Sequence, residues 1–151
     1  MSTQTRTENR APAATARAIE TKLEVVVVPV SDVDRAKRFY GGLGWRLDGD
    51  FTSGPDWRAV QMTPPGSGCS IAFGKGLTKM TPGSLDNVMM VVPDADAVRA
   101  HLLERGIEAS EVDEQAWGRF VYFADPDGNQ WSLQQLPEWS GGAGGGDDSD
   151  G

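Results

Sequence analysis

The feature that most constrains this chain is a turn near its C-terminal end, from Asp125 to Gly128. Its proline presets φ near about −65°, and its glycine accepts a positive φ, so the four residues favour a tight reversal of the chain. Residues 119–123 and 130–134, on either side of the turn, are short runs of strand-forming residues. The pattern predicts a β-hairpin near the end of a domain.

The pairing register of this hairpin decides which side chains share a face. If Ala124 pairs with Asn129, then Val121 lies opposite Ser132, and directly opposed residues point to the same side of the sheet. One face then holds Tyr122, Trp131 and Leu133, and the other holds Val121, Ser132 and Gln134. We expect the first face to lie under a helix. The second face is small and polar, which suits the wall of a cavity.

Composition limits the class of protein. A length of 151 residues fits one compact domain with a real core. Lys and Arg number 14 against 22 Asp and Glu, so the net charge of −8 argues against nucleic acid or an anionic membrane as partner. No apolar run is long enough to cross a bilayer. A single cysteine allows no intrachain disulfide and favours a reducing cytoplasm.

The two ends of the chain differ from its middle. Residues 1–20 lack the apolar stretch of a secretory signal and predict a disordered tail, with a transit peptide as the alternative. Residues 140–151, rich in Gly and Asp, predict a second disordered tail. We therefore expect a single folded domain over residues 21–139, built of two modules at 21–77 and 85–139.

The order of predicted elements repeats along the chain. The first copy has strands at 23–30, from 44, at 57–63 and at 69–73, with a helix capped by Ser31 and ending near Tyr40. The second copy has strands at 87–92 and 107–112, a helix from Asp94 to about Arg105, and the closing hairpin. The alignment of the copies matches Asp32, Arg35 and Ala36 with Asp96, Arg99 and Ala100, and Gly68, Ile71, Ala72 and Phe73 with Gly128, Trp131, Ser132 and Leu133. The repeat predicts two β-α-β-β-β modules.

Three segments carry a resemblance to a known family: VVVVPVSDVDRAKRFYGGLGW (25–45), PPGSGCSIAFG (64–74) and FADPDGNQWSLQQ (123–135). The chain resembles the vicinal oxygen chelate superfamily, which includes glyoxalase I, bleomycin-resistance proteins and extradiol dioxygenases. The resemblance implies an α+β fold. In that fold two βαβββ modules form a cup-shaped, eight-stranded mixed sheet, with the helices outside and the ligand inside.

Metal-dependent members of this family place four His, Gln or Glu ligands on the inward face of four strands. The resemblance places those positions at Val25, Ala72, Met89 and Ser132. None of these is a usual ligand for Mg, Zn or Fe. Neighbouring residues point to the opposite face and cannot replace them. We therefore predict a member without metal or other cofactor.

Strand alternation, extended by the repeat, predicts which side chains line the cup. Gln61 and Gln134 occupy comparable positions in the two copies, so we expect them to fix a polar group of the ligand. Apolar walls with a few amides and aromatic rings suit a small-molecule pocket. The predicted ligand-binding residues are Val25, Val27, Trp57, Gln61, Ser70, Ala72, Met89, Val91, Trp117, Arg119, Val121, Ser132 and Gln134.

Several of these side chains have an alternative role. Trp57 and Trp117 either stack on a planar ligand or belong to the core. Arg119 either donates to an acidic or phenolic ligand or forms a rim salt bridge with Asp113 or Glu114.

Other conspicuous residues are expected to be structural. His101 lies in the middle of a helix outside the cup, and Cys69 has no partner that would activate it. Tyr40 and Tyr122 are assigned to the helix-facing core. Asp125 and Asp127 are assigned to the turn.

No side chain that could act as a general acid or base is predicted to lie inside the cup. Two functions are consistent with this. The first is a binding protein that sequesters a small, partly aromatic molecule, as the drug-resistance members of the family do. The second is a metal-independent cyclase, isomerase or lyase of natural-product metabolism. We expect a homodimer. Closure of the cup within one chain and closure across a swapped dimer are both consistent with the sequence.

Overall fold

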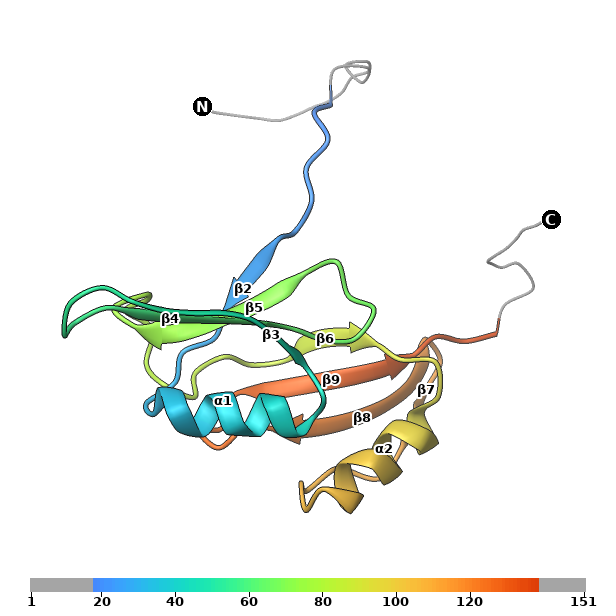
Figure 1. The fold of residues 1–151 in the computed structure, drawn as a ribbon. Helices are drawn as coiled ribbons and strands as arrows, with labels where there is room; N and C mark the ends of the chain where they lie inside the picture. Colours follow the sequence, from blue (N-terminus) through green and yellow to red (C-terminus); the bar gives the residue numbers. More distant parts are fainter. Residues whose placement is uncertain (1–17, 139–151) are drawn as a thin grey trace.

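The computed structural model describes residues 18–138. Figure 1 shows the first module as β2 (Val25–Val27), α1 (Val33–Gly42), β3 (Arg46–Thr52), β4 (Arg58–Thr63) and β5 (Ser70–Lys75). The second module has β6 (Val88–Val91), α2 (Ala95–Glu104), β7 (Asp113–Gln115), β8 (Gly118–Ala124) and β9 (Gln130–Gln135). The tail predicted at 140–151 lies outside the described residues, as does all but 18–20 of the tail predicted at 1–20.

Backbone hydrogen bonds join the strands into two sheets of four. The first sheet has the order β2-β5-β4-β3 and the second the order β6-β9-β8-β7. In each sheet the first pair is parallel and the others are antiparallel. The prediction of an α+β fold with two βαβββ modules is confirmed, with the eight strands divided between two sheets. Neither helix in residues 18–138 is long and apolar enough to cross a membrane.

Each helix begins at an aspartate whose carboxylate accepts a backbone N–H three residues later. Asp32 accepts from Arg35 at 3.0 Å and Asp94 from Ala97 at 3.1 Å, which satisfies a donor that the first turn leaves free. The prediction of Ser31 as the first cap is therefore wrong by one residue. The helices end before Gly44 and Gly106, which have φ values of 88° and 74° that favour glycine.

The core lies between the helices and one face of each sheet. Tyr40 of α1 is fully buried, and its ring lies 5.7 Å from Phe73 of the first sheet and 6.0 Å from Trp131 of the second. The helices also touch each other, because Arg105 donates to the carbonyl of Gly42. One apolar core therefore holds both modules, and Val28 contributes to it as predicted.

The caps show how the two modules correspond. Asp32 is equivalent to Asp94, so the predicted match of Asp32 with Asp96 is wrong by two residues. Val27 and Met89 each precede their cap by five residues, and they pair with Ala72 and Ser132 respectively. The predicted match of Ala72 with Ser132 is therefore consistent with the structure.

The register predicted for the closing hairpin is wrong by one residue. Ala124 pairs with Gln130, and Phe123 pairs with Trp131. The turn is longer than predicted because the Asp125 carboxylate accepts the backbone N–H groups of Asp127 and Asn129. The predicted strand at 107–112 also differs, since the ladder with β8 begins only at Asp113.

Candidate functional site

We call the face of each sheet that points away from the helices its open face. Phe51, Met89 and Val91 are exposed on it, whereas Ser70, Phe120 and Ser132 are buried. On the first sheet it includes Val25, Val27, Phe51, Gln61, Ser70 and Ala72, since these share a side through their pairing. On the second sheet it includes Met89, Val91, Asp113, Phe120, Tyr122, Ser132 and Gln134. Val26 and Val28 point toward the helices, and Val25 and Val27 away from them, as predicted.

One row of residues crosses the open face of the first sheet. Val27, Ala72, Gln61 and Gly49 lie on four successive strands, each about 4.8 Å from the next. A Cβ on Gly49 would collide with the Phe51 ring, so this ring lies across the glycine. Phe51 is 61% exposed. Sequence reasoning missed it because the bulge after Leu47 shifts the register of β3.

The equivalent row on the second sheet is polar. Met89, Ser132 and Tyr122 lie on successive strands, and the Tyr122 hydroxyl donates to Asp113 Oδ2 at 2.6 Å on the outermost strand. Hydrogen bonds from Tyr122 and Gln115 lower the pKa of Asp113, and the bond to Asp113 raises the pKa of Tyr122. The row therefore ends in a carboxylate that stays ionised at neutral pH.

The corrected hairpin register changes which residues of β8 face the ligand side. Val121 is fully buried in the helix-facing core, and Arg119 binds Asp96 of α2 and Glu114 at 2.9 Å each. The placement of Val121 and Arg119 inside the cup is wrong, and the salt-bridge alternative holds for Arg119. The assignment of Tyr122 to the helix-facing core is wrong for the same reason.

The two amides that we expected to act together do not correspond. Gln61 pairs with Ala72, whereas the residue that pairs with the equivalent Ser132 is Tyr122. Gln134 follows Ser132 by two residues on the same face of β9, and its amide donates to the Trp117 carbonyl at 2.8 Å. The Gln134 amide therefore makes a contact within the fold.

The two tryptophans of the predicted site lie in hairpin loops. Trp117 is in the turn between β7 and β8 and is 59% exposed, and Trp57 precedes β4 beside Gly76. Neither belongs to the apolar core, so the core alternative fails for both.

A pocket of about 620 Å³ lies along the seam between the modules. Ser70, Met89 and Val91 of the predicted set line it, together with helix-facing residues such as Val26 and Leu133. Gln61, Ala72, Ser132 and Gln134 lie outside this lining. The volume fits a drug-sized molecule, and most of the lining is apolar.

The positions that we expect to correspond to the metal ligands of metal-dependent members do not fit a metal ion here. They are Val25, Ala72, Met89 and Ser132. Three of these side chains have no hard donor atom, and Ser132 offers one neutral oxygen. Within residues 18–138 no three His, Cys, Asp or Glu side chains converge.

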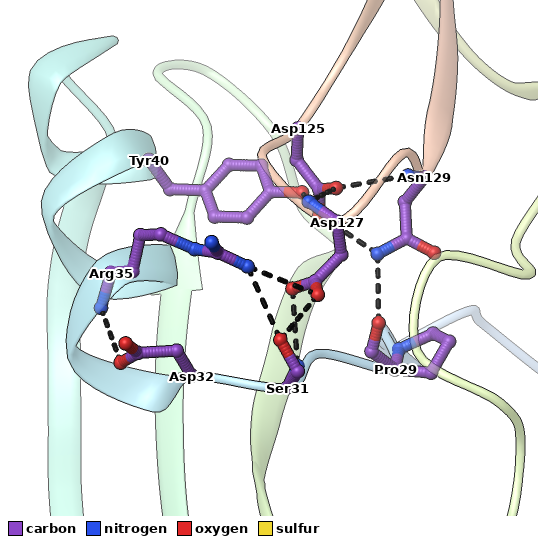
Figure 2. A network of polar contacts seen from close by, with 8 residues as sticks. All are labelled: Pro29, Ser31, Asp32, Arg35, Tyr40, Asp125, Asp127 and Asn129. Atoms are coloured by element: carbon purple, nitrogen blue, oxygen red, sulfur yellow. Dashed lines mark hydrogen bonds and ion pairs between the residues drawn. The ribbon is translucent and has the colours of Figure 1, made fainter.

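A buried polar network ties the hairpin turn to the first module (Figure 2). Asp125 accepts the Tyr40 hydroxyl at 2.8 Å, and Asn129 donates to the Pro29 carbonyl at 2.8 Å. Asp127 accepts from Ser31 and Arg35. Burial and then the charge of Asp125 raise the pKa of Tyr40, so the hydroxyl keeps its proton. The aspartates predicted as turn residues therefore also fix the two modules together.

His101 and Cys69 both line the pocket along the seam. His101 Nε2 lies 3.5 Å from the carbonyl oxygen of Leu43, and the structural role expected for His101 stays a prediction. Cys69 is half-buried at the start of β5, with Sγ 3.5 Å from the Ser70 carbonyl.

Comparison with known proteins agrees with this architecture. TnmS3, an antibiotic-binding protein from Streptomyces sp. CB03234, is 34% identical, with a TM-score of 0.73 over 80% of this chain and 100% of its own. A glyoxalase/bleomycin resistance protein from the same organism is 36% identical, with a TM-score of 0.67 over 76% and 100%. YetH of Bacillus subtilis (strain 168) is 25% identical over 117 residues, 76% of this chain and 98% of YetH. A family model matches residues 22–133, and the chain belongs to the Glyoxalase/Bleomycin resistance protein/Dioxygenase superfamily.

Proposed function

We propose that this protein binds and sequesters a small, partly aromatic molecule, in the manner of an antibiotic-binding protein. The observation that carries the proposal is the similarity to TnmS3, which extends over the whole of that protein at 34% identity. Such a role belongs with antibiotic resistance or secondary metabolism, and we place it in the cytoplasm.

The chemistry of the open faces supports binding of an aromatic molecule. Phe51 offers an exposed ring that lies over Gly49. On the other open face the half-buried Tyr122 stacks on the buried ring of Phe120, with the ring centroids 6.2 Å apart. Aromatic rings provide large contact area at low entropic cost, while the polar groups orient the ligand.

We also propose that binding needs no metal ion. The four positions equivalent to the ligands of metal-dependent members offer a single neutral oxygen, from Ser132. Elemental analysis after mild dialysis is expected to find less than about a tenth of a divalent ion per chain, and a chelator is expected to leave binding unchanged. About one Mg, Mn, Zn or Fe per chain, removable with loss of binding, would refute this part of the proposal.

A homodimer is part of the same proposal. Large apolar side chains are exposed on both open faces, with Phe51 at 61%, Met89 at 50% and Val91 at 64%. Figure 1 shows the segment before β2 leading away from the body of the fold, and Leu23 within it is 81% exposed. Exposed apolar surface of this kind is characteristic of interfaces. Light scattering coupled to gel filtration should give twice the mass of one chain.

The decisive test separates sequestration from catalysis. The purified protein is incubated with a panel of aromatic antibiotics, and native mass spectrometry detects any complex. The molecular mass of the released compound is then measured by liquid chromatography–mass spectrometry. Binding with an unchanged compound mass supports sequestration. A changed mass identifies a metal-independent enzyme, and failure to retain any aromatic compound contradicts the proposal.

A further inference from the structure

The hydroxyl groups on the open face of the second sheet use their hydrogens in bonds within the fold. Tyr122 donates a hydrogen bond to Asp113 Oδ2, and Ser132, which is buried, donates one to Asn87 Oδ1. The oxygen of the half-buried Tyr122 still offers its lone pairs. A group that approaches this oxygen must therefore supply a hydrogen of its own.

Asp113 also offers only acceptor atoms to a ligand. Both of its bonds, from Tyr122 at 2.6 Å and from the Gln115 amide at 2.9 Å, fall on Oδ2. Oδ1 makes no further hydrogen bond within residues 18–138, and a carboxylate oxygen only accepts. Asp113 Oδ1 and Tyr122 Oη thus form a pair of adjacent acceptors with a negative charge.

The position of this pair is suited to recognition. Tyr122 and Asp113 are half-buried, so they are accessible yet partly shielded from water. A row of side chains leads from them through Ser132 to Met89, which lines the pocket along the seam. An aromatic molecule lying along that row would bring its polar end to Tyr122.

Resting on the proposed function, we propose that Tyr122 and Asp113 select ligands that carry a hydrogen-bond donor, a hydroxyl or an ammonium, on an aromatic body.

Four biphenyl probes that differ only in the para group test this selection. Hydroxybiphenyl and aminomethylbiphenyl carry donors, methoxybiphenyl replaces the hydroxyl hydrogen with a methyl group and so lacks the donor, and biphenylcarboxylate is an anion. Calorimetry should show both donor probes binding about tenfold more tightly than the methyl ether, and the carboxylate more weakly than the ether. Comparing the ammonium with the neutral hydroxyl separates charge from hydrogen bonding.

Two variants test whether Tyr122 and Asp113 cause the preference for the donor probes, and a third controls for the loss of charge. Tyr122→Phe keeps the stacked ring, and Asp113→Asn keeps the shape of the carboxyl group. Each should reduce the preference for hydroxybiphenyl over methoxybiphenyl to within about twofold, while affinity for the ether is unchanged. Asp96→Asn removes an equal charge on the helix side, where Asp96 pairs with Arg119, and should keep the preference.

Each outcome decides the matter. Equal binding of hydroxybiphenyl and methoxybiphenyl by the wild-type protein overturns the selection while leaving small-molecule binding intact. A preference that survives both variants shows that the donor is recognised elsewhere, and it also overturns the assignment. Absence of binding by all four probes at about 1 mM contradicts the selection, and the antibiotic panel then decides the proposed function separately.

Discussion

Replacing Tyr40 with Phe removes one buried oxygen from the junction of the two modules. The Tyr40 hydroxyl donates to Asp125 at 2.8 Å and accepts from the Trp131 indole N–H at 3.0 Å. Tyr40 is fully buried and Trp131 is 2% exposed, so water cannot easily replace either bond. The ring itself stays, and with it the contacts to Phe73 and Trp45.

The cost of Tyr40→Phe follows from those two bonds. A hydrogen bond to a charged acceptor contributes roughly 1.5–3 kcal/mol, and an orphaned buried donor costs about 1–3 kcal/mol. Asp125 keeps the amide of Asn129 and two backbone donors, so its own loss is partly offset. We expect the free energy of unfolding to fall by about 2–4 kcal/mol, with a Tm lower by roughly 10 °C for a domain of this size.

Urea unfolding followed by tryptophan fluorescence measures this change, with the slope m expected to stay constant. Tyr122→Phe is the matched control, because its hydroxyl also donates to an aspartate but stands on the half-exposed open face. If Tyr40→Phe destabilises the protein no more than Tyr122→Phe does, burial of the network around Tyr40 does not stabilise the junction of the modules.

Two further predictions concern the first sheet. Gly74→Ala should lower the free energy of unfolding by about 1–3 kcal/mol in thermal melts, since its Cβ would collide with the backbone carbonyl of Arg58, whereas Gly42→Ala, with free space around it, should not. Asp50 pairs with Arg58 and Lys37, which holds its pKa well below the unfolded value of 3.8. Its contribution is therefore present above about pH 4 and lost as the pH falls further, so Asp50→Asn should flatten the acid side of the stability profile.

The sequence was sufficient for the fold because local signals agreed with the global pattern. The aspartate caps, the glycines that end the helices and the repeat in element order all indicate the same two modules. The face of a strand next to a capped helix was also predictable. Val28 is buried and Val27 is on the open face, as alternation requires.

The candidate site was less predictable because a shift of one residue in the strand pairing moves every side chain of that strand to the opposite face. One additional residue in the closing turn moved Tyr122 to the open face and Val121 to the core. The sequence does contain the missing signal. Pairing Phe123 with Trp131, and Val121 with Leu133, gathers these four large apolar side chains on one face. The contact of Asp113 with Tyr122 could not be predicted from the sequence, since β7 has only three residues and no apolar pattern.

Separation of the two faces also implies that residues of the open face can change without loss of stability. Met89 occupies a position that we predict to match a metal ligand of metal-dependent members, and it is 50% exposed, while its neighbour Met90 packs against the core. Met89→Glu should therefore change the free energy of unfolding by less than about 1 kcal/mol. Met90→Glu places a charge against apolar side chains and should cost roughly 2–4 kcal/mol. Chemical denaturation of both variants at low protein concentration measures the difference. Similar losses for the two would mean that the open face stabilises the fold as much as the core does, and the chemistry of the site would then not be free to change independently.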